Sequence, residues 1–115
     1  MKRDMDLIRK ILLIVEESKS SNVIEGYTQD EIKYHQSLII EADLAKGRVL
    51  PDFSSPTNIP AVVNISGLTW KGHDFIEAIS SDTNWQKVKD FLKDAGKQIT
   101  IETIKAATIS LFGFQ

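Results

Sequence analysis

Residues 67–75, GLTWKGHDF, form the stretch of the chain whose side chains are best suited to chemistry. An indole, an imidazole and a carboxylate lie within five positions, at Trp70, His73 and Asp74. Together they could form a catalytic or binding patch. The alternative is that the two glycines and the threonine of this stretch mark the point where a strand runs into a helix. The elements that surround it must decide.

Neither histidine sits in a pattern typical of a catalytic or metal centre. His73 and Glu77 are four residues apart on an expected helix, so their side chains could meet. Two ligands are too few for zinc, and the chain has no cysteine. His35 lies on an apolar stripe with Ile32 and Ile39, which favours a core-edge histidine with a local hydrogen bond over a proton shuttle. No phosphate loop or serine nucleophile motif is present, so we expect no enzyme, metal or other cofactor.

The composition is that of an ordinary globular protein. The 115 residues predict a single domain, and 42% hydrophobic and 26% charged residues are typical values. The net charge of −2 gives no basic excess of the kind that binds nucleic acid or anionic membranes. Charged residues interrupt the apolar run near the start, and no stretch reaches the roughly 18 apolar residues of a membrane span. We expect a soluble, cytoplasmic protein without a membrane partner.

Periodicity and turn residues predict helices over 4–18, 28–43, 70–80, 84–95 and 101–112, and strands over 45–50 and 61–66. The VIEG segment (23–26) is read as a short strand, and the proline-rich 51–60 as a loop. Thr28 and Glu31 form a capping box that begins the second helix. The expected N-caps of the later helices are Thr69, Asp82 or Thr83, and Thr100.

This order predicts a mainly α (α+β) fold: a winged-helix-like domain with a β-hairpin wing and two additional C-terminal helices. The single domain, 1–115, would consist of a core over 1–81 and a helical extension over 82–115. Gly72 is expected on the buried face of its helix, where the missing side chain allows close approach to the core. GLTWKGHDF is therefore interpreted mainly as a strand-to-helix junction.

Three segments, MKRDMDLIRKILL, GYTQDEIKYHQSLIIEADL and GLTWKGHDFIEAISSDTNWQKVK, resemble an uncharacterised family of small bacterial and phage proteins, a domain of unknown function. More loosely, LIIEADLAKG followed by a strand and LTWKGHDFIEAI resembles the layout of winged-helix transcription regulators. The first resemblance implies no activity. The second implies a winged-helix fold and a DNA-binding regulator of a phage or mobile element.

Two features depart from the regulator pattern. Residues 28–44 are shorter than the roughly twenty-odd residues of a full helix-turn-helix, so they form either one helix or a compressed version of that motif. The expected outward face of this helix carries two acidic residues and one basic residue, and is made of Asp30, Lys33, Tyr34, Ser37 and Glu41. DNA-reading helices normally bring arginine or lysine to the phosphates. The residues alone therefore favour a protein-interaction or adaptor module without DNA binding. The winged-helix layout favours DNA binding instead, so we expect a DNA-binding regulator, with the interaction module as the alternative.

Seven residues are candidate contacts to DNA or to a protein partner: Lys33, Tyr34, Ser37, Lys46, Arg48, Trp70 and His73. For Trp70, we favour coverage by the C-terminal helices over a contact role. Leu111, Phe112 and Phe114 either complete the core of the monomer or form the seam of a homodimer.

Overall fold

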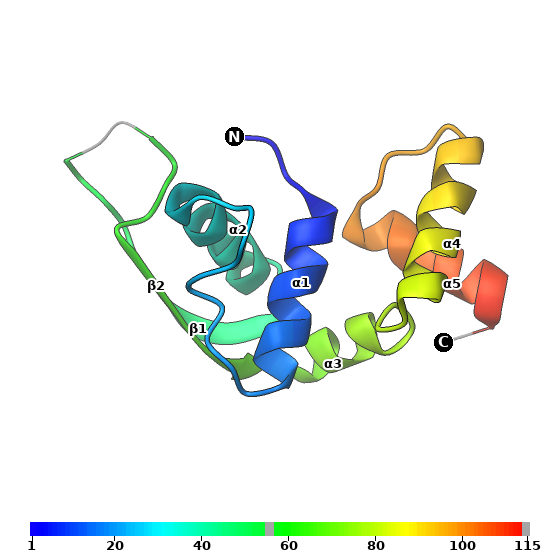
Figure 1. Cartoon of the computed structure of the whole chain (residues 1–115), viewed down its shortest axis with the longest axis horizontal. Coiled ribbons are helices and arrows are strands. Elements are labelled where there is room, and N and C mark those ends of the chain that lie inside the picture. Colours follow the sequence, from blue (N-terminus) through cyan, green and yellow to red (C-terminus); the bar gives the residue numbers. More distant parts are fainter. Residues whose placement is uncertain (55–56, 114–115) are drawn as a thin grey trace. The chain divides into compact units, whose positions relative to one another are not determined.

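A computed structural model describes residues 1–54 and 57–113. Within these residues the chain forms five helices and one antiparallel pair of strands (Figure 1). In chain order they are α1 (Met5–Glu16), α2 (Gln29–Glu41), β1 (Ala45–Leu50), β2 (Val62–Leu68), α3 (Trp70–Glu77), α4 (Asp82–Asp94) and α5 (Ile101–Phe112). The predicted α+β layout, with a hairpin and two C-terminal helices, is confirmed. None of these helices is long and apolar enough to cross a membrane.

The chain packs as two compact units that divide between His73 and Asp74, inside α3. The first unit holds α1, α2 and the hairpin, and the second holds α4 and α5. The organisation as a single domain, with its core over 1–81, stays a prediction.

The core of the first unit forms because α1 and α2 pack against each other and both pack against the hairpin. Helix α1 buries almost a full side of apolar side chains, as its dense hydrophobic pattern predicts. The buried side chains of the unit include Leu7, Ile8, Ile11 and Leu12 of α1, Ile32 and Ile39 of α2, and Leu44 and Val63 at the hairpin.

Helix α2 is continuous, which settles the alternative between one helix and a compressed helix-turn-helix. Its capping box is present: the Thr28 hydroxyl accepts from the Glu31 N–H at 3.1 Å, and the Glu31 carboxylate accepts from the Thr28 N–H at 2.9 Å. The helix ends before Asp43, which adopts the left-handed conformation with φ of 61°. The 17–28 segment, called the linker below, holds no strand, so the strand predicted at 23–26 is wrong. A strand needs a pairing partner, and no backbone hydrogen bond joins the linker to β2 among the described residues.

The hairpin pairs Ala45 with Leu68 at one end and Leu50 with Val62 at the other. The register shifts between Lys46 and Gly47, which is a β-bulge. At Gly47 a Cβ atom would overlap the carbonyl oxygen of Asn64 and lie 2.9 Å from the Ile40 side chain. Glycine is therefore required where the hairpin meets α2.

In the second unit, α4 packs against α5. The buried side chains of these two helices are Trp85, Val88, Leu92, Ile104, Ala107 and Thr108. Helix α4 is capped by Ser81, whose hydroxyl accepts from the Asn84 N–H, so the prediction of Asp82 or Thr83 is wrong. The predicted cap at Thr100 is confirmed. Leu111, expected in a core or a dimer seam, is 38% exposed, and Phe114 lies outside the described residues.

Candidate interaction surfaces

The GLTWKGHDF segment forms the predicted strand-to-helix junction, and its centre is closed. The Thr69 hydroxyl donates to the Asp43 carbonyl at 2.6 Å and accepts from the Gly72 N–H at 3.0 Å, which caps α3. The Thr69 N–H donates to the Leu44 carbonyl at 3.1 Å. A Cβ atom on Gly72 would overlap that same carbonyl oxygen. The threonine and the glycine thus have structural roles.

Two candidates in this segment do point to solvent. Trp70 is 86% exposed. Its coverage by the C-terminal helices, which belong to the second unit, stays a prediction. Its position as the first residue of α3 explains the exposure, since the buried face of that helix starts at Gly72. His73 is exposed as well. Its backbone N–H donates to the Thr69 carbonyl at 3.0 Å, while its imidazole makes no hydrogen bond or ion pair within the described part of the chain.

His35 is a structural residue, as its place on the apolar stripe predicts. It is 2% exposed, and its Nε2 atom accepts from the Asp4 N–H at 2.8 Å. Its Nδ1 atom lies 2.7 Å from the Glu31 carbonyl oxygen. Because a carbonyl only accepts, Nδ1 donates to it, while Nε2 serves as the acceptor. The ring therefore ties α2 to the start of α1 and is not free for catalysis.

The outward face of α2 offers little to a nucleic acid. Asp30 and Glu41 are exposed, while Lys33, Tyr34 and Ser37 are half-buried. The Ser37 hydroxyl donates to the Tyr34 carbonyl at 2.6 Å, so its donor is already used within the helix. A face with two carboxylates and one ammonium group repels phosphates on balance.

The far end of the hairpin exposes apolar side chains. We call this surface the hairpin end and define it by Val49, Leu50, Phe53 and Val62, which are all exposed. Phe53 is 94% exposed, far more than an aromatic ring in a core or at its edge. Aromatic side chains are enriched where proteins bind one another.

The hairpin end lies beside the outward face of α2. A hollow of about 200 Å³ is lined by Ser37 of α2 together with Val49, Asp52 and Ile59 of the hairpin and its loop. Hydrogen bonds from the Ser54 side chain and backbone, with a smaller contribution from Lys33, lower the pKa of the Asp52 carboxyl below its usual value. The structure thus brings Lys33 and Ser37 together with the hairpin loop.

Lys46 and Arg48 lie on β1 and are exposed. Within the described residues neither makes an ion pair. They are the two cations of the hairpin itself, as the sequence indicates, and the tip beyond them is apolar.

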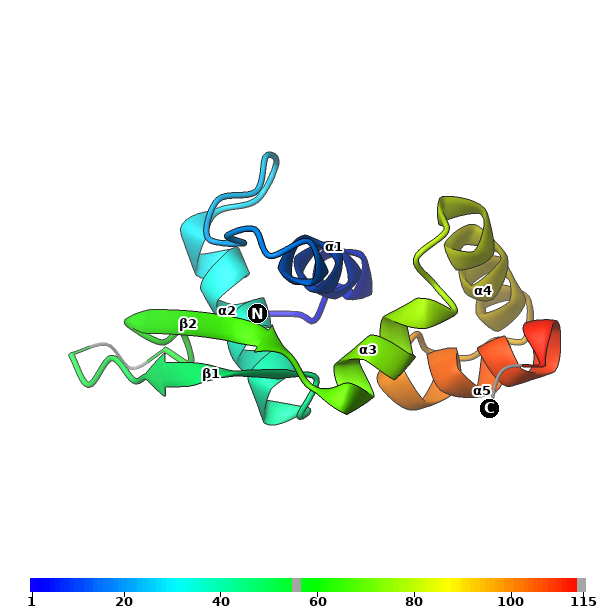
Figure 2. The same ribbon diagram turned by 90° about the horizontal axis from the view of Figure 1, so that it is seen from below.

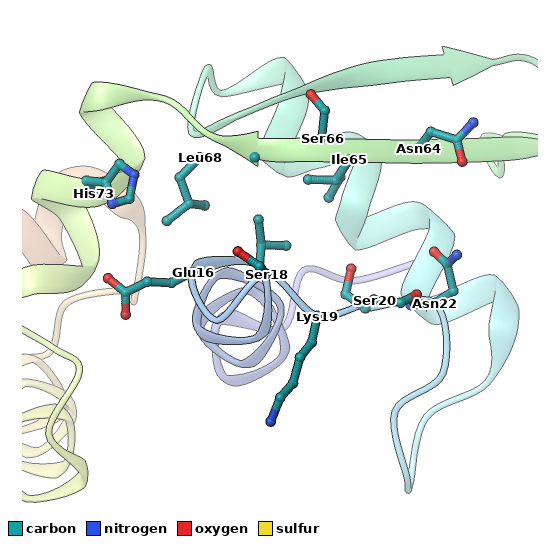
Figure 3. A pocket seen from close by; sticks show the side chains of 13 residues that line it. Glu16, Ser18, Lys19, Ser20, Asn22, Asn64, Ile65, Ser66, Leu68 and His73 are labelled. Atoms are coloured by element: carbon teal, nitrogen blue, oxygen red, sulfur yellow. Dashed lines mark hydrogen bonds between the residues drawn. The ribbon is translucent and has the colours of Figure 1, made fainter.

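A second surface, which sequence reasoning missed, runs along β2. A groove of about 520 Å³ lies between the linker and residues 64–68, and we call it the β2 groove (Figure 3). Nine of its thirteen lining residues are polar, among them Ser18, Ser20, Asn22, Ser66 and His73. His73 stands at one end of this groove, so one of the candidate residues belongs to it.

The linker forms one wall of the β2 groove because side chains of α2 hold it in place. The amide nitrogen of the buried Gln36 donates to the Ser21 hydroxyl at 2.9 Å and to the Asn22 side chain at 3.1 Å. Gln29 donates to the Asn22 carbonyl at 2.9 Å. These bonds fix the linker without pairing it to the strand. No local sequence pattern predicts this groove, because its two walls, residues 18–22 of the linker and residues 64–68, lie more than forty residues apart in the sequence.

The described residues hold no group of three histidine, aspartate or glutamate side chains that could bind a metal ion. In the same part of the chain, no hydrogen bond joins His73 to a serine hydroxyl of the β2 groove.

Comparisons with known proteins place the chain in a family. Residues 2–98 match the model of the family described as "Hypothetical protein (DUF2513)". The chain is 32% identical over 111 residues to an uncharacterized protein of Haemophilus influenzae, covering 91% of this chain and 90% of that protein. No solved structure matches it. The chain belongs to the DUF2513 family, in agreement with the family resemblance of its three segments.

Proposed function

We propose that this member of the DUF2513 family is a protein-interaction module that binds a polypeptide partner through the hairpin end. The observation that carries the proposal is the exposure of Phe53, together with Leu50 and Val62, at the tip of the hairpin. Burial of an apolar tip of this kind against a partner stabilises the complex by roughly 25 cal/mol per Å² of apolar surface removed from water.

The charges beside the hairpin end support the same choice. The outward face of α2 carries Asp30 and Glu41 against the single cation of Lys33. A protein surface of mixed charge fits such a face, whereas a phosphate backbone meets net repulsion.

Binding of duplex DNA, as a regulator of a phage or mobile element, is the second candidate. The exposed side chains of Lys46 and Arg48 favour it, because within the described residues no carboxylate neutralises them. With Lys33 they would make about three phosphate contacts. Three contacts predict that the DNA affinity falls about 40-fold between 50 and 200 mM salt.

The two candidates separate in one titration series. Fluorescence anisotropy of a labelled 30-base-pair duplex is measured at both salt concentrations with the wild-type chain and with a Lys46→Glu/Arg48→Glu variant. The proposal predicts no saturable binding with either protein. Saturable binding that falls about 40-fold with salt and is lost in the double variant would replace the proposal by the DNA-binding function.

The polypeptide partner is tested by photo-crosslinking in living bacteria that express the chain. A photoreactive amino acid replaces Phe53 in one variant and the exposed Phe91 of α4 in the control. The proposal predicts a discrete crosslinked band from position 53 that is absent from position 91. Loss of the band when Leu50→Ser is added to the Phe53 variant ties it to the hairpin end. Equal patterns from both positions would contradict the proposal.

A further inference from the structure

We propose that the β2 groove binds an extended peptide segment of a partner protein, which adds to the free edge of β2 as a third strand. This inference rests on the proposed function, since it assigns a second contact surface to the same kind of partner. It differs from the hairpin end in location, chemistry and test.

The first step is the open edge. The sheet has two strands, and β1 occupies one edge of β2. The linker passes on the other side of β2, and Figures 2 and 3 agree on this placement. Among the described residues no backbone hydrogen bond crosses from the linker to β2. The N–H and C=O groups that alternate along this edge are therefore left for another chain or for water.

The second step is the room beside that edge. The β2 groove extends along residues 64–68 and holds about 520 Å³, which is in the range of ligand sites in proteins. The linker closes its far side, where Gln36 holds Ser21 and Asn22. A folded hairpin from a second copy would meet that wall. A single extended segment needs only one strand spacing, about 4.8 Å, beside β2.

The third step is the chemistry of the lining. Hydroxyl and amide groups predominate, from Ser18, Ser20, Asn22, Asn64 and Ser66. No aromatic side chain other than the His73 imidazole lines the groove, which disfavours a flat apolar ligand or a lipid chain. A peptide backbone offers the matching donors and acceptors at the repeat of a strand. The side chains that enter the groove should be small or polar.

The fourth step is charge. Glu16 and Lys19 line the groove with opposite charges, and Lys19 also pairs with Glu17 at 3.2 Å. The formal charge of the lining is zero when His73 is neutral. The affinity of the peptide should therefore change little with salt, unlike the affinity of a phosphate ligand.

The probe is a phage-displayed library of random twelve-residue peptides, selected on the full-length wild-type chain and counter-selected on Ser20→Trp. Ser20 is exposed and lines the groove, so tryptophan there fills the space at little cost to folding. Ser110→Trp, at an exposed position of α5, is the matched control. Equal melting temperatures of the three proteins show that each is folded.

The selected peptides are then synthesised and their affinities measured at 50 and 200 mM salt. The proposal predicts binding to the wild type and to Ser110→Trp, with a loss of about tenfold or more on Ser20→Trp. Amide NMR shifts should be largest at residues 64–68. Methylation of successive peptide nitrogens should weaken binding at every second position, because only alternate N–H groups face β2.

Three outcomes would overturn the proposal. One is a library that yields no peptide preferring the wild type over Ser20→Trp. Another is peptide binding that is lost in Phe53→Ser but kept in Ser20→Trp. That result would place the peptide at the hairpin end, in keeping with the proposed function, and not in the β2 groove. The third is a methylation scan without a period of two.

Discussion

The two ends of β2 differ in how far their side chains are held by the rest of the chain: those at one end are hydrogen-bonded and packed, and those at the other are exposed to solvent. At the Leu68 end, Thr69 and Gly72 are fixed by hydrogen bonds and by contact with the Leu44 backbone. At the Val62 end, the hairpin leaves Phe53 exposed to solvent. In the chemically richest segment of the sequence, Thr69 and Gly72 therefore have structural roles, whereas Trp70 and His73 are exposed. The Val62 end has simple side chains, and exposure makes it the better candidate for function.

The largest expected difference in stability is between alanine substitutions at two glycines, Gly72 and Gly67. Gly72→Ala should lower the stability of the first unit by about 1–3 kcal/mol, because the new methyl group overlaps the Leu44 carbonyl. Gly67→Ala meets no atom within 4 Å and should leave stability unchanged or raise it by about 0.5 kcal/mol. Urea unfolding of both variants measures the difference. Equal stabilities would show that the junction is not closed.

The two histidines differ in the same way, since His35 is buried and His73 is exposed. His35→Leu removes the acceptor for the part-buried Asp4 N–H and should cost about 1–3 kcal/mol. His73→Ala removes an exposed ring and should hardly move the melting temperature. Thermal unfolding followed by circular dichroism compares them. A large drop in the melting temperature of the His73 variant would show that His73 has a structural role.

The smallest effect concerns the loop of the hairpin. Hydrogen bonds from Ser54, helped by Lys33, lower the pKa of Asp52 below 3.8. The charged form is favoured in the folded loop, so this contribution is present above pH 3.8 and is lost as the pH falls through the lowered pKa. A carbon-13 NMR titration of the Asp52 carboxyl should show the shift, and Ser54→Ala should return the part that comes from the hydroxyl, since the backbone N–H of residue 54 remains. An Asp52 pKa that does not change in Ser54→Ala would contradict this reading of the loop.

Local signals account for the parts of the fold that the sequence predicts well. The Thr28 capping box and the Thr100 cap fix the starts of α2 and α5, because their partners lie three residues away. The predicted cap of α4 at Asp82 or Thr83 is wrong, because Ser81, directly before them, is also able to cap and does so. Burial of Gly72 and exposure of His73 also follow from helical periodicity.

The remaining features depend on contacts between distant residues. The predicted strand at 23–26 does not form, because Gln29 and Gln36 hold the linker at Asn22, away from β2. The β2 groove arises from that arrangement and leaves no local pattern. Exposure of Trp70 likewise depends on which side of α3 faces the core. The sequence predicts only a loop at 51–60, because the exposure of Phe53 depends on how that loop packs against the rest of the chain.

The most direct test of the account is amide hydrogen exchange along β2 in the free protein. If one edge of the strand is open, residues 62–68 should fall into two alternating classes, with N–H groups facing β1 protected and those facing the linker exchanging rapidly. Uniform protection along β2 would mean that the edge is already paired. That result would contradict the claim that the hairpin offers an unoccupied surface to a polypeptide partner.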